Sequence, residues 1–208
     1  MARLILASAS PRRKELLAQA GYTFEVRAAH VNEDVRAGED PIAYVLRLAR
    51  DKAQVVFDQV GDREAVVLGA DTTVTLDGHI LGKPENADDA ARMLRMLSGR
   101  THRVITGVAV VSQRSDEGLP LGTPQKSRLA ERVEVAAEVT GVRFLTLSDA
   151  EIAAYVASGE PMDKAGAYGI QGPAAKWIPR VEGDYFNVVG LPLALVNIML
   201  EAAPGKRK

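Results

Sequence analysis

The stretch of sequence that decides the fold reads Leu4-Ile-Leu-Ala-Ser-Ala-Ser-Pro-Arg-Arg-Lys-Glu-Leu-Leu17. Its first four residues are apolar and predict a short buried strand. Ser10 is a suitable helix N-cap and Pro11 suits the first helical position, while Gly21 predicts the end of that helix. A strand, a tight turn and a helix in this order are typical of an α/β protein.

The rest of the chain extends this unit to an α/β fold with a mixed sheet flanked by helices. Apolar runs predict strands at 65–76, 103–111 and 132–144, and capped apolar patterns predict helices at 41–58, 86–99, 148–159 and 191–202. Asp77-Gly78 predicts a hairpin turn after the first of these strands. The polar residues 112–130 predict a surface loop, and the glycine-rich residues 166–190 predict strands and loops over a cleft.

The helix predicted at 41–58 is amphipathic. Its apolar residues Ile42, Val45, Leu48 and Ala49 recur at helical spacing and predict a buried stripe. Lys52 falls outside this stripe, so its default interpretation is a lysine on the protein surface.

The composition is that of a soluble globular protein without thiol chemistry. Of 208 residues, 47% are apolar, 25% are charged and none is cysteine, which excludes disulfides and thiolate metal sites. A net charge of −1 provides no overall field to attract nucleic acid or an anionic membrane. The longest apolar run, residues 191–200, is far shorter than the ~20 residues that a membrane span needs. We therefore expect one cytoplasmic domain over residues 1–208, with no nucleic-acid or membrane partner.

The turn from Ser8 to Arg13 is the first candidate binding site. The start of a helix offers free backbone N–H groups and the positive end of the helix dipole to an anion. The hydroxyl groups of Ser8 and Ser10 and the guanidinium groups of Arg12 and Arg13 add donors that suit phosphate oxygens. The segment lacks the glycines and the Gly-Lys-Ser/Thr ending of a P-loop. Taken alone, the pattern also fits an ordinary capped helix with solvated arginines.

Carboxylates supply the second candidate. Asp71 ends an apolar run, at the edge where open α/β sheets place their ligands. Such a group can hold Mg²⁺ or accept a proton from water, although an isolated Asp also serves as a turn or cap residue. Glu33, in a polar loop, is a further candidate whose default interpretation is a solvated side chain.

Three lysines and a further carboxylate complete the charged candidates. Lys83 lies in a turn from which its ammonium group can reach phosphate, and Lys164 lies beside Asp163 in a glycine-rich segment that allows close backbone approach to a ligand. With Lys52, they provide positive charge for several phosphates, and the carboxylates suit a hard divalent cation. Since the chain has no cysteine nucleophile, this set of groups predicts attack by water on a phosphoryl group, with catalysis by positioning and charge neutralisation.

Three long motifs follow one another along the chain. They are Leu6-Ala-Ser-Ala-Ser-Pro-Arg-Arg-Lys-Glu-Leu-Leu17, then Leu68-Gly-Ala-Asp-Thr-Thr-Val74 with Gly82-Lys-Pro84, and finally Asp163-Lys-Ala-Gly-Ala-Tyr-Gly-Ile-Gln-Gly172. Together with Glu182-Gly-Asp-Tyr-Phe-Asn-Val-Val-Gly-Leu-Pro192, they resemble the Maf family of nucleotide pyrophosphatases over nearly the whole chain. The polar residues 112–130 depart from the family pattern, because this stretch looks longer than usual.

The resemblance implies hydrolysis of a nucleoside triphosphate between its α and β phosphates, which keeps non-standard nucleotides out of nucleic acids. It also implies a divalent cation, Mg²⁺ or Mn²⁺, and an elongated α/β fold of two lobes with a cleft between them. Asp71 would be the catalytic carboxylate, and it would hold the metal together with Glu33. The residues implied to set substrate specificity are Arg12, Thr72 and Gln171. Those implied to contact phosphates are Ser8, Arg13, Lys52 and Lys83. Asp163 and Lys164 are additional candidates from the third motif.

The third motif resembles the branch of the family that acts on dTTP, UTP and modified pyrimidine nucleotides. Gln171 suits this substrate class because its amide both donates and accepts hydrogen bonds at a pyrimidine edge. Two alternatives stay open, namely a pyrophosphatase for a modified purine nucleotide such as 7-methyl-GTP and a nucleotide-sensing regulator of cell division. The resemblance is compatible with a homodimer, and it leaves open whether Asp71 acts as a general base or mainly as a metal ligand.

Overall fold

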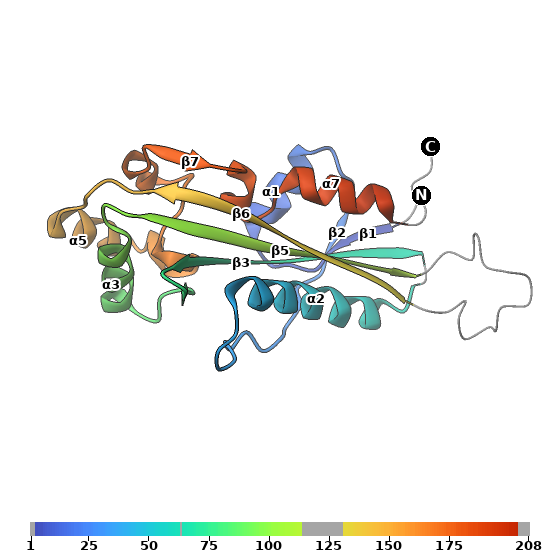
Figure 1. The fold of residues 1–208 in the computed structure, drawn as a ribbon. Helices are drawn as coiled ribbons and strands as arrows, with labels where there is room; N and C mark the ends of the chain where they lie inside the picture. The colour runs from blue at the N-terminus through green and yellow to red at the C-terminus, as the bar shows by residue number, and fades with distance from the viewer. Residues whose placement is uncertain (1–2, 63, 114–130, 204–208) are drawn as a thin grey trace, which may run out of the picture.

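A seven-stranded mixed sheet runs through the molecule (Figure 1). The structure is a computed structural model that describes residues 3–62, 64–113 and 131–203. Its strands are β1 (Arg3–Leu6), β2 (Glu25–Val26), β3 (Ala65–Leu76), β4 (His79–Leu81), β5 (Thr101–Gln113), β6 (Glu131–Arg143) and β7 (Arg180–Glu182). They lie in the order β2-β1-β3-β5-β6-β7, and β4 pairs with β3. β1 is parallel to β2 and β3 and the other pairs are antiparallel, so the predicted mixed α/β sheet is confirmed.

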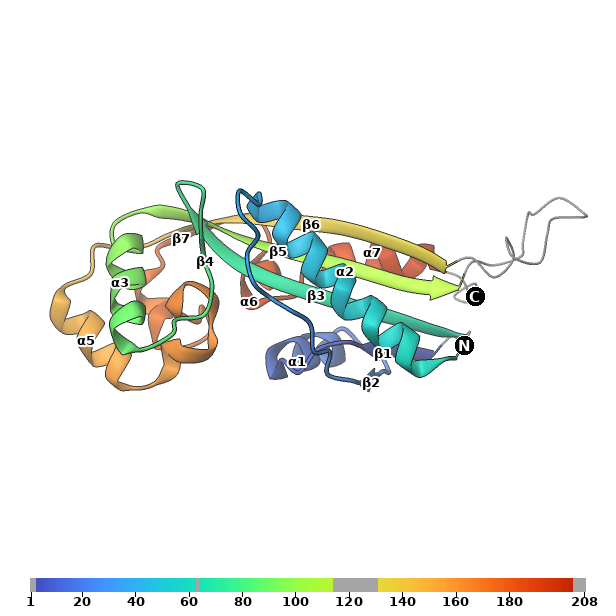
Figure 2. The same cartoon turned by 90° about the horizontal axis from the view of Figure 1, so that it is seen from below.

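Helices cover both faces of this sheet and divide the elongated molecule into two lobes (Figures 1 and 2). One lobe contains α1 (Pro11–Gln19), α2 (Pro41–Val60), α6 (Tyr185–Val189) and α7 (Leu193–Ala202). The other contains α3 (Ala87–Leu97), α5 (Asp149–Ala157) and the short helices η1 (Glu160–Asp163), η2 (Ala165–Ala167) and η3 (Pro173–Trp177). α2 lies along one face, α1 and α7 lie on the opposite face, and β3, β5 and β6 continue between the lobes. Within the described residues, we find no helix with both the length and the apolar character needed to cross a membrane.

Local sequence signals determine most of these elements. Ser10 caps α1 by accepting a hydrogen bond from the backbone N–H of Arg13 at 3.4 Å, and Pro11 is the first residue of the helix. Ser148 and Glu151 form the predicted capping box at the start of α5. The helices expected at 41–58, 86–99, 148–159 and 191–202, and the strands at 65–76, 103–111 and 132–144, are confirmed to within two residues at either end.

Several predictions differ from the structure. Ser112 and Gln113 do not begin a loop but extend β5, because the pairing with β6 continues to the end of that strand. The remainder of the predicted loop, residues 114–130, lies outside the described residues. Residues 166–190 contain mainly short helical turns and only one short strand, β7. Ile42 is 40% exposed, since burial along α2 starts with Tyr44 and Val45.

The backbone of the sheet is in direct contact with α2 at two glycines. A Cβ atom on Gly69 in β3 would lie 2.3 Å from the backbone oxygen of Ala49, and one on Gly107 in β5 would lie 2.3 Å from that of Val45. Such contacts are too short for any side chain, so only glycine permits this approach. It brings Lys52 from α2 down beside β3, where the lysine is 8% exposed. The default interpretation of Lys52 as a surface residue is therefore wrong.

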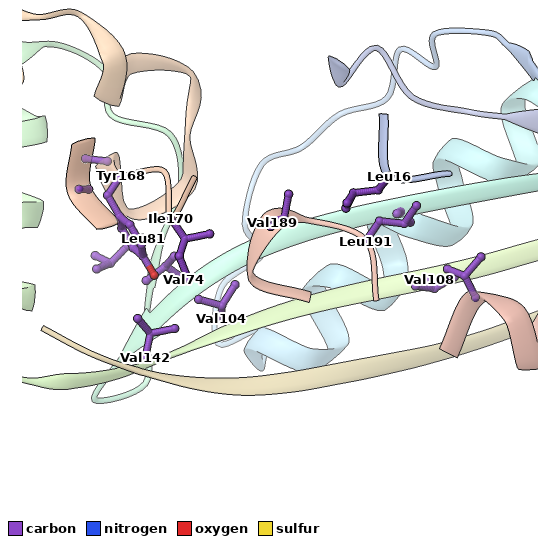
Figure 3. Close-up of a cluster of buried hydrophobic side chains, with 14 of the residues drawn as sticks. Leu16, Val74, Leu81, Val104, Val108, Val142, Tyr168, Ile170, Val189 and Leu191 are labelled. Carbon is purple, nitrogen blue, oxygen red and sulfur yellow. The ribbon is translucent and has the colours of Figure 1, made fainter. Parts of the chain in front are cut away.

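The larger apolar core lies on the face of the sheet opposite α2 and extends under both lobes. Figure 3 shows Tyr168 and Leu81 close to Val74 in one part of this core, with Val189 and Leu191 near Leu16 in another. The two lobes therefore share one continuous apolar core.

Candidate functional site

The candidate site lies at a gap along one edge of β3. β1 pairs with β3 only as far as Leu68, and β4 pairs with it only from Val74 onward. Between these points, residues 69–73 pair with β5 alone among the described strands. Because side chains alternate along a strand, Asp71 and Thr72 project to opposite faces at this open edge.

A cavity of about 570 Å³ opens at this edge and is lined by both lobes. Its walls come from the β1–α1 turn, β3, the loop after β4, the segment from η1 to Gly172 and the end of α6. All the site residues predicted from sequence line it, and these are Ser8, Arg12, Arg13, Glu33, Lys52, Asp71, Thr72, Lys83, Asp163, Lys164 and Gln171. The fold thus brings the predicted residues together in one place, while their individual roles stay predictions.

Lys52 is the centre of a charged cluster on the α2 side of the cavity. Its Nζ donates to Asp71 Oδ1 at 2.7 Å and lies 2.6 Å from Glu33 Oε1. Tyr44 Oη donates to the backbone oxygen of Glu33 at 3.0 Å, which fixes the loop that carries this glutamate. Burial raises the pKa of Asp71, and the positive charges of Lys52 and Arg13 offset this only in part. Burial also acts to raise the pKa of Glu33, but its hydrogen bond and ion pair with Lys52, together with the charges of Lys83 and Arg13, outweigh that effect and lower the pKa.

The same carboxylates are the candidate metal ligands. Within residues 3–62, 64–113 and 131–203, no three His, Asp or Glu side chains gather into a preformed metal site. Asp71 and Glu33 nevertheless converge on a single cationic atom, Lys52 Nζ. Since Mg²⁺ is usually held by one or two protein carboxylates together with substrate phosphates, this donor set fits such an ion.

Arg13 is held at all three nitrogens of its guanidinium group. Nε donates to the backbone oxygen of Gly190 at 2.9 Å, Nη1 to Ser8 Oγ at 3.2 Å and Nη2 to Thr72 Oγ1 at 3.0 Å. Ser8 Oγ also accepts from the backbone N–H of Ser10 at 3.2 Å. A guanidinium group has five N–H donors, so the two that remain are preorganised for an anion beside the start of α1.

The other wall of the cavity is formed by the second lobe. Arg12 Nη1 is 3.0 Å from Asp163 Oδ2, so an ion pair connects α1 to η1. Lys164 Nζ donates to Asp163 Oδ1 and to the backbone oxygen of Glu160, both at 2.7 Å. Lys164 is therefore tied to its own loop, whereas Lys83 is an exposed side chain on the cavity lining.

Sequence reasoning missed several residues that build or support the cavity. Tyr44 and Tyr168 line it. The sequence pointed to Tyr44 only in that a residue with a hydroxyl group lies on the buried side of α2. Thr106 and Asn187 lie behind the cavity wall and are fully buried. Asn187 belongs to the segment near 182–192 that resembles the Maf pattern, but nothing in the spacing distinguished Thr106 from other strand residues.

The sequence is similar to known proteins over nearly its full length. The family model described as Maf-like protein matches residues 3–203. A protein from Koribacter versatilis (strain Ellin345), named dTTP/UTP pyrophosphatase, is 52% identical over 200 residues, which cover 96% of this chain and 94% of the relative. A protein of the same name from Bacillus pumilus (strain SAFR-032) is 45% identical over 201 residues, covering 97% of this chain and 96% of the relative.

One solved structure, a nucleoside-triphosphatase or dITP/XTP pyrophosphatase from Mycobacterium abscessus, aligns with 99% of this chain and 100% of its own. Its TM-score is 0.41 and its sequence identity is 13%, a similarity too low to support an argument about fold or function.

Proposed function

Because the chain belongs to the Maf family, we propose that it is a nucleoside triphosphate pyrophosphatase that hydrolyses dTTP and UTP to the monophosphate and pyrophosphate. Relatives that carry this name match it over almost their entire length. The observation that carries the proposal is the cavity at the edge of β3, where cationic side chains from several segments lie around Asp71 and Glu33. In the cell, the reaction would keep modified pyrimidine nucleotides out of nucleic acids.

The β1–α1 turn is suited to bind the phosphates. The start of α1 and the side chains of Ser8 and Arg13 line the cavity together, so the positive end of the helix dipole and these donors are available to an anion. Lys83 adds a positive charge to the same cavity. Lys52 would exchange a carboxylate contact for a phosphate oxygen as the substrate arrives. Several cations are needed because a triphosphate carries several negative charges.

Asp71 is the group that we assign to proton transfer from the attacking water. Its raised pKa suits a proton acceptor better than an ordinary aspartate, since general bases work best when their pKa approaches the working pH. The water oxygen bonds to one phosphorus atom of the α–β anhydride while its proton passes to Asp71. The bond between the α and β phosphates breaks, and the monophosphate and pyrophosphate separate. Asp71 and Glu33 would hold Mg²⁺ or Mn²⁺, which when bound neutralises phosphate charge as a Lewis acid.

Base selection is assigned to the second lobe. Gln171 is an exposed amide in the cavity lining and comes from the second lobe, whereas the phosphate-binding turn belongs to the first. Its amide can pair with the carbonyl and N–H groups of a uracil or thymine ring. Arg12, which forms an ion pair with Asp163 of the second lobe, is the second candidate for substrate selection.

We further infer that residues 1–208 act as one domain, because a single apolar core extends under both lobes. The family resemblance is also compatible with a homodimer. Light scattering after size-exclusion chromatography distinguishes the 22.3 kDa monomer from a dimer of twice that mass.

Product analysis with dTTP and Mg²⁺ tests the proposed reaction. We expect dTMP and pyrophosphate, whereas dTDP and orthophosphate would contradict cleavage between the α and β phosphates. The kcat/KM values for dTTP and UTP should exceed those for ITP and 7-methyl-GTP. If either purine nucleotide were preferred by about tenfold or more, the chain would be a purine-directed enzyme instead.

A further inference from the structure

The guanidinium group of Arg13 is held by a chain of hydrogen bonds that runs behind the cavity. Arg13 Nη2 donates to Thr72 Oγ1, which lies 2.9 Å from Thr106 Oγ1. Thr106 Oγ1 donates to the backbone oxygen of Asn187 at 3.1 Å. Thr106 and Asn187 are 0% exposed and neither lines the cavity, so they can affect a ligand only through their neighbours, and Thr72 is the neighbour of Thr106 that contacts Arg13.

The direction of these hydrogen bonds follows from the number of protons available. Each threonine hydroxyl has one hydrogen and two lone pairs. The carbonyl of Asn187 can only accept, so Thr106 donates to it and accepts from Thr72. Thr72 has then used its hydrogen, and its oxygen can only accept from Arg13. The remaining contact of Thr72 Oγ1, with the oxygen of Gly190, is the longest at 3.4 Å, and that oxygen already accepts from Arg13 Nε.

The far end of the chain is fixed by the surrounding sheet. Asn187 Nδ2 donates to the backbone oxygen of Val104 at 3.0 Å and to Thr140 Oγ1 at 2.8 Å, which anchors α6 across β5 and β6. The carbonyl of Asn187 belongs to the last turn of α6, where carbonyls lack a donor from within the helix. Thr106 supplies that donor and thereby connects Arg13 to a rigid part of the molecule.

We propose that Thr106 is a positioning residue for phosphate binding, acting through Thr72 on the guanidinium of Arg13. The proposal rests on the proposed function in one respect, namely that Arg13 contacts the substrate phosphates. It places Thr72 on the phosphate side of the site as a support for Arg13, rather than as a reader of the base, which is the role implied by the family resemblance. The affinity for a ligand that has phosphate groups but no base should therefore depend on both threonines.

Binding of inorganic pyrophosphate to the full chain, measured by calorimetry, provides the test. Thr106→Val keeps the shape of the side chain but removes its hydroxyl, and we expect Kd to rise about tenfold, as for loss of support to one charged hydrogen bond. Thr106→Ser restores the hydroxyl and should stay within about twofold of the unchanged chain. Thr75→Val is the matched control, because this threonine is buried in β3 and its hydroxyl has no hydrogen-bond partner among the described residues.

A double-mutant cycle shows whether the effect passes through Arg13. In an Arg13→Ala background, Thr106→Val should change the Kd for pyrophosphate by less than about twofold, since the group that it positions is absent. An equal effect in both backgrounds would overturn the proposal, as would a Thr106→Val variant that binds pyrophosphate like Thr75→Val.

Thr72→Val provides a second variant if Thr106→Val does not fold, as judged by circular dichroism. It should raise the Kd for pyrophosphate about as much and leave the ratio of kcat/KM for UTP and CTP unchanged. A changed ratio of kcat/KM for UTP and CTP, with an unchanged Kd for pyrophosphate, would contradict the proposal. Thr72 would then be a residue that sets base specificity.

The binding assay is independent of turnover, so the two proposals fail separately. Normal pyrophosphate binding without hydrolysis of dTTP would contradict the proposed function and leave the positioning role of Thr106 open to the same variants. No measurable binding of pyrophosphate to the unchanged chain would overturn the positioning role, even if dTTP were hydrolysed.

Discussion

Asp71 is a buried carboxylate with a buried cationic partner. It is 8% exposed, and its partner Lys52 is equally buried. Desolvation of the carboxylate raises its pKa, yet the ion pair keeps a compensating charge beside it. Removing the charge without changing the shape of Asp71 therefore separates its catalytic role from its structural one.

The Asp71→Asn variant should lose about a thousandfold in kcat, the usual contribution of a general base, while its Kd for dTTP measured by calorimetry changes little. Asp77→Asn is the control, since Asp77 is an exposed residue of the β3–β4 turn and should leave kcat unchanged. Full activity in the Asp71→Asn variant would remove this residue from the mechanism.

His102 is a buried histidine whose protonation opposes folding. Its Nε2 lies 2.7 Å from Tyr168 Oη, and its ring packs edge-on against Phe144 at 5.1 Å between centroids. Burial lowers its pKa from 6.5 to about 4. In the unfolded chain the imidazole binds a proton below pH 6.5, whereas in the folded chain it does so only below about pH 4.

The free energy of unfolding should therefore decrease by about 3 kcal/mol, from this residue alone, as the pH falls from 6.5 to 4. Above pH 6.5 the imidazole is neutral in both the folded and the unfolded chain, so the stability that its burial as a neutral ring provides is fully present. Urea titrations across this range should show a shallower pH dependence for His102→Gln, while the exposed His79→Gln should behave like the unchanged chain. Equal slopes for His102→Gln and the unchanged chain would show that His102 does not control stability in this range.

At the scale of elements, the contact of α2 with the sheet determines where Lys52 lies. The two glycines that face α2 come from neighbouring strands, with Ala70 of β3 opposite Val108 of β5 between them in the register. A methyl group at either glycine would push the helix outward and take Lys52 away from Asp71.

Gly107→Ala should lower the free energy of unfolding by about 2 to 3 kcal/mol and also raise KM for dTTP, because overpacking displaces the helix that carries Lys52. Gly141→Ala is the matched control in the next strand, since a Cβ there would make an ordinary contact of 3.7 Å with Glu182. Denaturant unfolding and steady-state kinetics measure the two effects. A Gly107→Ala variant as stable as Gly141→Ala would show that α2 is free to shift.

The helices and strands were predictable because their signals are local. Ser10 caps a helix by a contact three residues away, and Ser148 does the same at α5. The burial of Lys52 follows from helical spacing, since it lies seven residues after Val45 and four after Leu48 on the buried side of α2. Its close approach to β3 was not predictable, because it depends on glycines in two strands that are distant in sequence. Thr106 meets Thr72 only through the register of β3 and β5, which no sequence spacing reveals.

At the scale of the whole molecule, the two lobes are connected across the cavity by the ion pair of Arg12 and Asp163. Their side chains are 30% and 63% exposed, so water screens the attraction. The lobes are held together mainly by the shared sheet and core, and the ion pair serves to orient Arg12.

Asp163→Asn should change the free energy of unfolding by less than about 1 kcal/mol and raise KM for dTTP by up to about fivefold. Glu182→Gln removes an equally exposed carboxylate from an ion pair with Arg180, away from the cavity, and should leave KM unchanged. Denaturant unfolding and initial-rate measurements check both values. Loss of several kcal/mol in Asp163→Asn would mean that the ion pair, and not the sheet, joins the lobes.

The open edge of β3 restricts the mutations that this protein can tolerate. Asp71 faces α2 and Lys52, while its neighbour Thr72 faces Arg13 on the other side of the sheet. A codon inserted between those for Ala65 and Ala70 would shift the strand by one position and exchange these two faces. Conservative substitutions in β3 can accumulate one at a time, but a change in the length of the strand cannot. Sequences that descend from this one should therefore vary in length in the loops and not in β3.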